Sequence, residues 1–167
     1  ACYKYKENFS SFGGHNMACG LSIDIDKIND FRKFLNENSK MTKRDKEKVI
    51  NIDTAISIDK LSLEFADSIN NLKPFGKDFE KPIFADKAVT IENIAMIGKN
   101  KNTMRLSLKK GDISINAIKF NAIDMAEYLV EKFGKNIRGN KIDIVYYPDI
   151  NQFRGNKTLQ LRLIDIR

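Results

Sequence analysis

The chain has 167 residues, of which 42% are hydrophobic and 31% are charged, and it carries a formal net charge of +7. This length suits one domain of ordinary size or two small ones, and the apolar fraction is too high for a disordered chain. No apolar run approaches the roughly 20 residues that a membrane helix needs, and the start lacks a signal-peptide pattern. We therefore expect a folded protein with no membrane partner.

Two cysteines and one histidine leave little room for disulfide or metal chemistry. Cys2 and Cys19 lie outside any CxxC or Cys/His cluster, and a disulfide scaffold needs more cysteines. His15 is the only histidine, and no closely spaced carboxylates join it as metal ligands would require. We expect a reduced, cytoplasmic protein that holds no metal or other cofactor in this chain. Its first residue is Ala1 rather than Met, which favours a fragment or a processed product.

Basic side chains gather in the second part of the chain. Residues 61–167 carry 18 basic and 13 acidic side chains, whereas residues 1–60 carry 11 and 9. Between residues 99 and 119, six basic side chains are accompanied by Asp112 alone among the acidic ones, and residues 132–167 hold eight more basic side chains. Local basic stripes favour a polyanionic partner, although any single lysine can equally be a solvated surface residue.

Periodicity in residues 1–72 predicts a mixture of short helices and strands. Apolar spacing of three or four residues predicts helices at 2–12, 26–36 and 61–72. Gly13-Gly14 ends the first helix, and residues 15–19 predict one helical turn closed by Gly20. Alternating apolar and polar residues predict strands at 21–25 and 49–58, and the mostly charged residues 41–48 predict a loop.

Residues 73–82 predict a boundary, because Pro74 and Pro82, two of the three prolines, lie there. Beyond it the pattern predicts strands at 83–97, 103–109, 112–120, 141–147 and 159–166, with one helix at 123–133. Three strands, a helix and two strands is the order of the five-stranded OB barrel. We therefore predict an α+β chain in which an α/β part, residues 1–72, is joined by the linker 73–82 to an OB barrel, residues 83–167.

Cations and aromatic rings alternate on the expected barrel. OB barrels bind single strands or oligosaccharides across their second and third strands and flanking loops. A flexible polyanion requires cations along its backbone and flat rings on which its bases stack. Alternation predicts that Phe120 and one of Tyr146 and Tyr147 point inward, so at least one of these aromatics should belong to the core. Residues 151–156 predict a hairpin turn with an exposed tip. The candidate residues for binding single-stranded DNA are Arg105, Lys109, Lys110, Lys119, Phe120, Tyr147, Phe153, Arg154, Lys157 and Arg162.

A second candidate site is the sequence Gly13-Gly14-His15. Adjacent glycines let another surface approach the backbone, and their N–H groups, together with a following helical turn, can hold an anion. His15 can donate to a phosphate oxygen. The same three residues are also typical of a simple cap, so both interpretations stay open. No nucleophile, paired-carboxylate or phosphate-loop arrangement accompanies them, and we expect no catalytic residue in this chain.

Three motifs in the right order resemble one enzyme family. GGHNMACGLS at 13–22 resembles the GGHxxAAG signature of the DHH-associated domain, the substrate-recognition half of the DHH phosphoesterases. LKPFG at 72–76, followed by PIF at 82–84, resembles the LxPFGxGNPxPxF linker of RecJ single-strand-specific exonucleases. The ending, INQFRG at 150–155 with later LQL and DIR segments, resembles the end of the RecJ OB domain. Cys19 replaces the usual second alanine, and the linker reads KDFEKP where GNP is usual.

The resemblance implies the C-terminal part of a RecJ-type 5′→3′ single-strand-specific exonuclease, which acts in DNA repair and recombination. In that family an amino-terminal DHH domain holds Mn²⁺ or Mg²⁺, which activates water. No Asp-His-His triplet occurs here, so the resemblance implies a chain that binds single-stranded DNA without cutting it. It also implies that Gly13, Gly14 and His15 contact substrate phosphate.

Two alternatives remain open. One is a non-catalytic module that docks a repair partner such as a helicase or a single-strand-binding protein, because an acidic protein tail also suits basic stripes. The other is part of an RNA-directed phosphoesterase of the same superfamily, which shares the GGH motif but does not normally carry the barrel.

Overall fold

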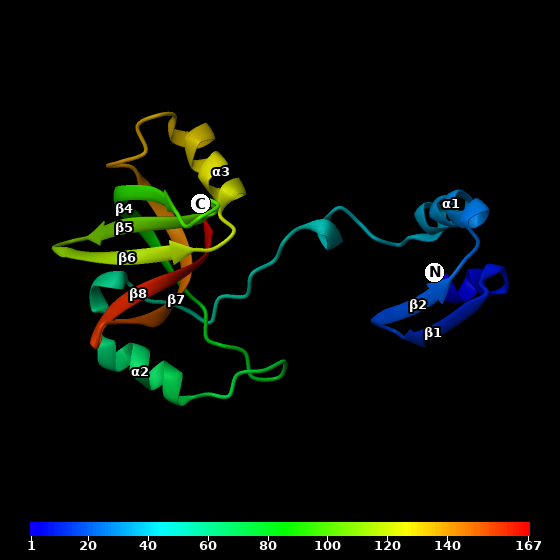
Figure 1. Ribbon diagram of the computed structural model, residues 1–167, viewed down its shortest axis with the longest axis horizontal. Coiled ribbons are helices and arrows are strands. Elements are labelled where there is room, and N and C mark those ends of the chain that lie inside the picture. The colour runs from blue at the N-terminus through cyan, green and yellow to red at the C-terminus, as the bar shows by residue number, and fades with distance from the viewer. The chain divides into compact units, whose positions relative to one another are not determined.

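The computed structural model describes residues 1–167, and the chain divides into two compact units, Ala1–Val49 and Ile50–Arg167 (Figure 1). The first unit contains the 3₁₀ helices η1 (Cys2–Asn8), η2 (Ile25–Lys27) and η3 (Arg44–Lys46), the strands β1 (Ser11–His15) and β2 (Ala18–Ser22), and the helix α1 (Ile28–Asn38). No helix of the chain is long and apolar enough to cross a bilayer.

Aromatic rings hold the first unit together. The ring of Tyr5 in η1 lies 4.7 Å from that of Phe34 and 5.3 Å from that of Phe31, both on α1, measured between centroids. Phe9 meets Phe31 edge-on at 5.1 Å and stacks on Phe12 at 5.6 Å. Such pairs contribute about 0.5–1.5 kcal/mol each beyond the area they bury. These rings therefore fix η1 and β1 against α1 in a unit that has no fully buried side chain.

The strands β1 and β2 form a hairpin, and the helical turn predicted at residues 15–19 is wrong. Gly13 pairs with Gly20, Gly14 with Cys19, and His15 with Ala18. A Cβ atom on Gly14, whose φ is +148°, would overlap the Ala18 carbonyl oxygen and the Cys19 backbone. At Gly14 the absence of a Cβ atom therefore lets two extended chains approach closely, where the sequence predicted a helix stop.

The second unit is a closed five-stranded barrel, which confirms the predicted OB architecture and the α+β class. The strands run in the spatial order β4-β5-β6-β8-β7, and a further pairing of β4 with β7 closes the ring. The pairing of β6 with β8 is parallel, and the other pairings in the ring are antiparallel. The elements are β4 (Phe84–Ile97), β5 (Thr103–Lys110), β6 (Ile113–Lys119), α3 (Ile123–Phe133), β7 (Lys141–Phe153) and β8 (Asn156–Ile166).

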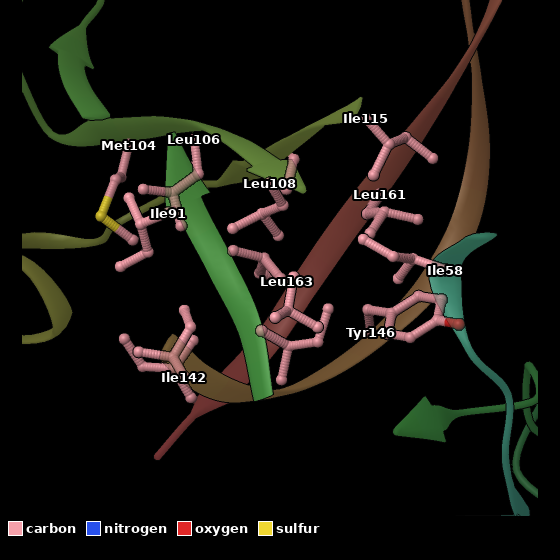
Figure 2. Close-up of a cluster of buried hydrophobic side chains, with 14 of the residues drawn as sticks. Ile58, Ile91, Met104, Leu106, Leu108, Ile115, Ile142, Tyr146, Leu161 and Leu163 are labelled. Atoms are coloured by element: carbon pink, nitrogen blue, oxygen red, sulfur yellow. The ribbon is translucent and has the colours of Figure 1, made fainter. Parts of the chain in front are cut away.

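Alternate residues of every barrel strand fill the interior. Met104, Leu106 and Leu108 of β5 are fully buried, while the residues between them face outward. Their side chains meet those of the other strands inside the barrel (Figure 2). The helix α3, through Leu129, covers one end, and α2 (Leu63–Asn71) with the 3₁₀ helix η4 (Ile58–Lys60) covers the other (Figure 1). Side chains fill the interior of the barrel, so a ligand site is expected on its outer surface.

Residues 50–72 belong to the barrel unit, so the division lies ahead of the linker that the prolines predicted at 73–82. The strand β3 (Thr54–Ala55) pairs in parallel with β4. The Tyr146 hydroxyl, inside the barrel, donates to the Ile56 carbonyl oxygen at 2.8 Å. Asp86, only 6% exposed, accepts from the Ile58 amide at 2.9 Å. These hydrogen bonds attach residues 56–58 to the barrel. Of the strand predicted at 49–58, only Thr54 and Ala55 form a strand.

Candidate nucleic-acid interface

The ladders of the barrel align two rows of outward side chains across five strands. In the first row Arg105 of β5 stands opposite Ala95 of β4 and Ile118 of β6, and Arg162 of β8 stands opposite Ile118 and Tyr147 of β7. Directly opposite residues share a face of the sheet. We call the members of both rows the outer face: Ala95, Arg105, Ile118, Arg162 and Tyr147 in the first row, and Asn93, Ser107, Asn116, Gln160 and Asp149 in the second.

A groove of about 250 Å³ opens on the outer face. Arg105 is its only charged residue, and no carboxylate lies within ion-pair distance of that guanidinium. Amide side chains of β6, β7 and β8 supply hydrogen-bond donors and acceptors. The groove is lined by Ile97, Arg105, Asn116, Ile118, Asn151, Thr158, Leu159 and Gln160. A free guanidinium amid amides and aliphatic side chains suits a ligand with both anionic and flat apolar parts.

Lys109 lies beside this groove with its charge partly neutralised. Its ammonium is 3.8 Å from a carboxylate oxygen of Glu92 on β4. Glu92 also accepts from the hydroxyls of Ser114 at 2.7 Å and Ser107 at 3.2 Å. The Ser114 hydrogen bond is the main cause that lowers the pKa of Glu92, and the charge of Lys109 adds to it. At neutral pH, Glu92 is therefore an anion that competes with any polyanion for Lys109.

Two cation–π pairs lie along the first row of the outer face. One of their rings, Phe120, follows the end of β6 and is 51% exposed, so the prediction that it points inward is wrong, whereas Tyr146 is buried. The guanidinium of Arg162 lies 4.5 Å from the ring centroid of Phe120, and the ammonium of Lys81 lies 3.9 Å from that of Tyr147. Between them, Asp149 accepts from Nε of Arg162 at 3.1 Å. Burial lowers the pKa of the Lys81 ammonium, and the charge of Asp149 opposes that shift. We define Phe120, Arg162, Asp149, Tyr147 and Lys81 as the cation–aromatic cluster.

Sequence reasoning missed Lys81 and Asp149 in this cluster. Asp149 was detectable, because it stands two residues from Tyr147 on one strand and so shares its face. Lys81 could not be predicted, because it lies in an irregular segment before β4. In such a segment no periodicity indicates on which side of the barrel a side chain lies.

Two predicted cations are engaged away from the outer face. The ammonium of Lys110 is hydrogen-bonded to the buried carboxylate of Asp86 and to the Lys87 carbonyl oxygen, the latter at 3.0 Å. The ammonium of Lys119 donates to the Ile164 carbonyl oxygen at 2.9 Å. Lys119 alternates with the outward Ile118, so its side chain leaves the opposite side of β6. Both lysines bind protein oxygens.

The β7–β8 hairpin ends in an exposed aromatic tip. Asn151 and Thr158 of the groove are paired in this hairpin, and two residues further on Phe153 pairs with Asn156. The turn consists of Arg154 and Gly155, with φ of 49° and 83°, a conformation in which glycine is favoured at the second position. Phe153 is 65% exposed, with the Arg154 guanidinium 5.2 Å from its centroid, and Lys157 is also exposed. The hairpin predicted at 151–156 is confirmed.

The Gly13-Gly14-His15 motif lies on the exposed β1–β2 hairpin of the first unit. The imidazole Nδ1 of His15 accepts from the Met17 amide at 3.2 Å. In the neutral imidazole this places the proton on Nε2, which can donate to an anion. His15 also lines a pocket of about 370 Å³ with Phe12, Cys19 and other residues of the first unit. No helix follows the motif, so any anion would be held by the imidazole and the hairpin backbone.

The residues present do not fit a divalent metal centre. His, Cys, Asp and Glu side chains form no group of three that can hold a metal ion. The resemblance assigns Mn²⁺ or Mg²⁺ to an amino-terminal DHH domain and not to these residues.

Comparison with known proteins identifies the barrel. Residues 52–165 match the family described as the RecJ OB domain. The chain belongs to the RecJ OB domain family. The single-stranded-DNA-specific exonuclease RecJ of Bacillus subtilis is 28% identical over 156 residues, which is 92% of this chain and 19% of that protein. The RecJ of Haemophilus influenzae is 31% identical over 158 residues, which is 92% of this chain and 26% of that protein.

The fold comparison extends beyond the RecJ OB domain itself. The crystal structure of RecJ from Thermus thermophilus in complex with Mg²⁺ matches with a TM-score of 0.66 and 13% identity, over 99% of this chain and 24% of that one. At this identity the likeness concerns the fold, and it includes the first unit as well as the barrel. The chain spans about a fifth to a quarter of the length of the curated relatives that it matches.

Proposed function

We propose that the chain is the C-terminal, DNA-binding part of a RecJ-type 5′→3′ single-strand-specific exonuclease, and that the outer face of its barrel binds single-stranded DNA. In this proposal the first unit is part of a DHH-associated domain. Its Gly13, Gly14 and His15 contact a substrate phosphate, and the whole enzyme acts in DNA repair and recombination. The names of the relatives support the substrate class.

The groove around Arg105 is the observation that carries the proposal. Arg105 is exposed, has no carboxylate within ion-pair distance and lies on β5, the second barrel strand, and the groove also takes in Asn116 and Ile118 of β6, the third. OB barrels bind oligonucleotides across these two strands. The β7–β8 tip, with Phe153, Arg154 and Lys157, continues from the far side of the groove. Cations along this path would release counterions from the DNA backbone, and the exposed rings would stack on bases without sequence preference.

Titration of labelled single-stranded and duplex DNA against the full chain tests the proposal. We expect tighter binding to the single strand, with a dependence on salt set by the number of phosphates contacted. Arg105→Ala removes one such contact, so at 0.1 M salt the affinity should fall about fivefold and the slope of log K against log salt by about 0.7. Lys135→Ala is the matched control, because Lys135 is exposed in the segment after α3 and lies outside the groove.

Three outcomes would contradict the proposal. Equal affinity for duplex and single-stranded DNA would contradict specificity for single strands. Equal losses of affinity in Arg105→Ala and Lys135→Ala would show that the groove is not the binding site. Tighter binding of RNA than of DNA of the same sequence would favour an RNA-directed phosphoesterase instead.

A further inference from the structure

Phe120 offers one open aromatic surface beside the groove. It follows β6 directly and is 51% exposed, although it is large and apolar. The Arg162 guanidinium lies over the ring, 4.5 Å from its centroid. The ring therefore contacts a cation and keeps about half of its surface open to solvent. This exposed surface is available to a flat ligand.

Asp149 holds the cation behind that ring. Its Oδ2 accepts from Nε of Arg162 at 3.1 Å, and its Oδ1 accepts from the Ile150 amide at 3.0 Å. The side chains of Arg162 and Asp149 are only 30% and 27% exposed. A guanidinium fixed in this way keeps its remaining donors in place and loses less conformational freedom when it binds an anion.

The charge around the ring is positive in excess. Arg162 and Lys81 belong to the cation–aromatic cluster, and the charge of Lys73 also acts on Lys81, whereas Asp149 is the one carboxylate of the cluster. An exposed aromatic ring next to a net positive charge is complementary to a flat ring that carries an anionic group. A nucleotide of a single strand has both parts, its base and its phosphate.

We propose that Phe120, backed by Arg162, is a stacking platform for one base of single-stranded DNA, and that Arg162 and Lys81 hold the neighbouring phosphate. This inference rests on the proposed function and adds the position at which one nucleotide of the bound strand would lie. It makes Asp149 a positioning residue, because its carboxylate acts through Arg162. The sign of its effect is unusual: a carboxylate on a DNA-binding surface strengthens binding.

Two oligomers of about 12 units and equal charge separate stacking from backbone attraction. One is labelled oligothymidylate, and the other has the same phosphates but abasic sugars. The wild-type chain should prefer the oligomer with bases. Phe120→Leu keeps an apolar side chain but removes the flat ring, and should weaken binding of oligothymidylate about tenfold with little change for the abasic oligomer. Tyr128→Leu is the matched control, because Tyr128 on α3 is also a half-exposed ring beside a cation, Lys132.

The variant Asp149→Asn tests whether the carboxylate of Asp149 strengthens or weakens DNA binding. The amide can still accept from the Ile150 amide but holds Arg162 without a charge, so oligothymidylate affinity should fall about threefold while the abasic oligomer binds equally well or better. Melting temperatures equal to that of the wild type would show that the fold is kept.

The outcomes distinguish this inference from the proposed function. If Arg105→Ala weakens binding but Phe120→Leu leaves the preference for bases unchanged, the platform is refuted and the groove stands. Tighter binding of both oligomers by Asp149→Asn would refute the positioning role. A wild-type chain that binds neither oligomer would refute both proposals.

Discussion

Replacing Asp86 by alanine should strongly destabilise the barrel unit, because this buried carboxylate joins three parts of the chain. It accepts hydrogen bonds from the Ile58 amide at 2.9 Å, the Ser57 hydroxyl at 3.3 Å and the Lys87 amide at 2.8 Å. It also binds the side-chain ammonium of Lys110. Asp86→Ala leaves the Lys110 ammonium and the Ile58 amide without their acceptor. Breaking a buried ion pair on one side costs about 3–5 kcal/mol of stability.

Urea and thermal unfolding measure this loss. For a unit of this size we expect a fall in melting temperature of roughly 10–20 °C. Asp112→Ala, in the exposed turn between β5 and β6, is the matched control and should change stability by less than about 0.5 kcal/mol. Below its melting temperature the Asp86→Ala variant should bind single-stranded DNA like the wild type, because Lys110 is engaged away from the outer face. A loss below about 1 kcal/mol would refute the reasoning.

Two further predictions concern the surfaces proposed to bind DNA. Glu92→Gln should free Lys109 and tighten single-stranded DNA binding by up to about fivefold at 0.1 M salt and pH 7, whereas Glu127→Gln on α3 should not. Because the pKa of Glu92 is lowered, its carboxylate stays charged below the ordinary glutamate pKa of about 4.3, so the difference should vanish only as the pH falls through that lowered pKa. Gly14→Ala should open the β1–β2 hairpin, seen as faster amide exchange, whereas Gly13→Ala, with open space at its Cβ position, should not; equal exchange in both variants would contradict the pairing.

Strands with strict alternation were predictable, and segments held by distant polar groups were not. Alternation of Met104, Leu106 and Leu108 with polar residues places β5 within one residue of its observed end. The same alternation around Ile56 predicted a strand, but that segment is shaped by Tyr146 and Asp86, which lie far along the chain. Local pattern carries no information about such partners, so the unit boundary was expected at the prolines.

The candidate site shows the same division. Alternation assigns Arg105 and Lys109 to the outward side of β5, and the position of Phe153 at a hairpin tip follows from the turn residues. Lys110 looks like its neighbours in the sequence, yet its ammonium binds a carboxylate that lies 24 residues earlier in the chain. Charge counts treat Lys109 and Lys110 alike, whereas the structure separates an exposed ammonium near Glu92 from one that is bound to a buried carboxylate.

The sequence by itself determined the barrel, its strand order and a basic, aromatic surface, because apolar periodicity records which side of each strand is buried. Only the tertiary structure decided which of those side chains act together. Closure of the ring brings Arg162 against Phe120 and Asp149, and it brings Glu92 against Lys109. The physical reason is that register between strands distant in sequence sets the distance between charges. This distance decides whether a cation is available to an outside anion or is bound by a carboxylate of the protein.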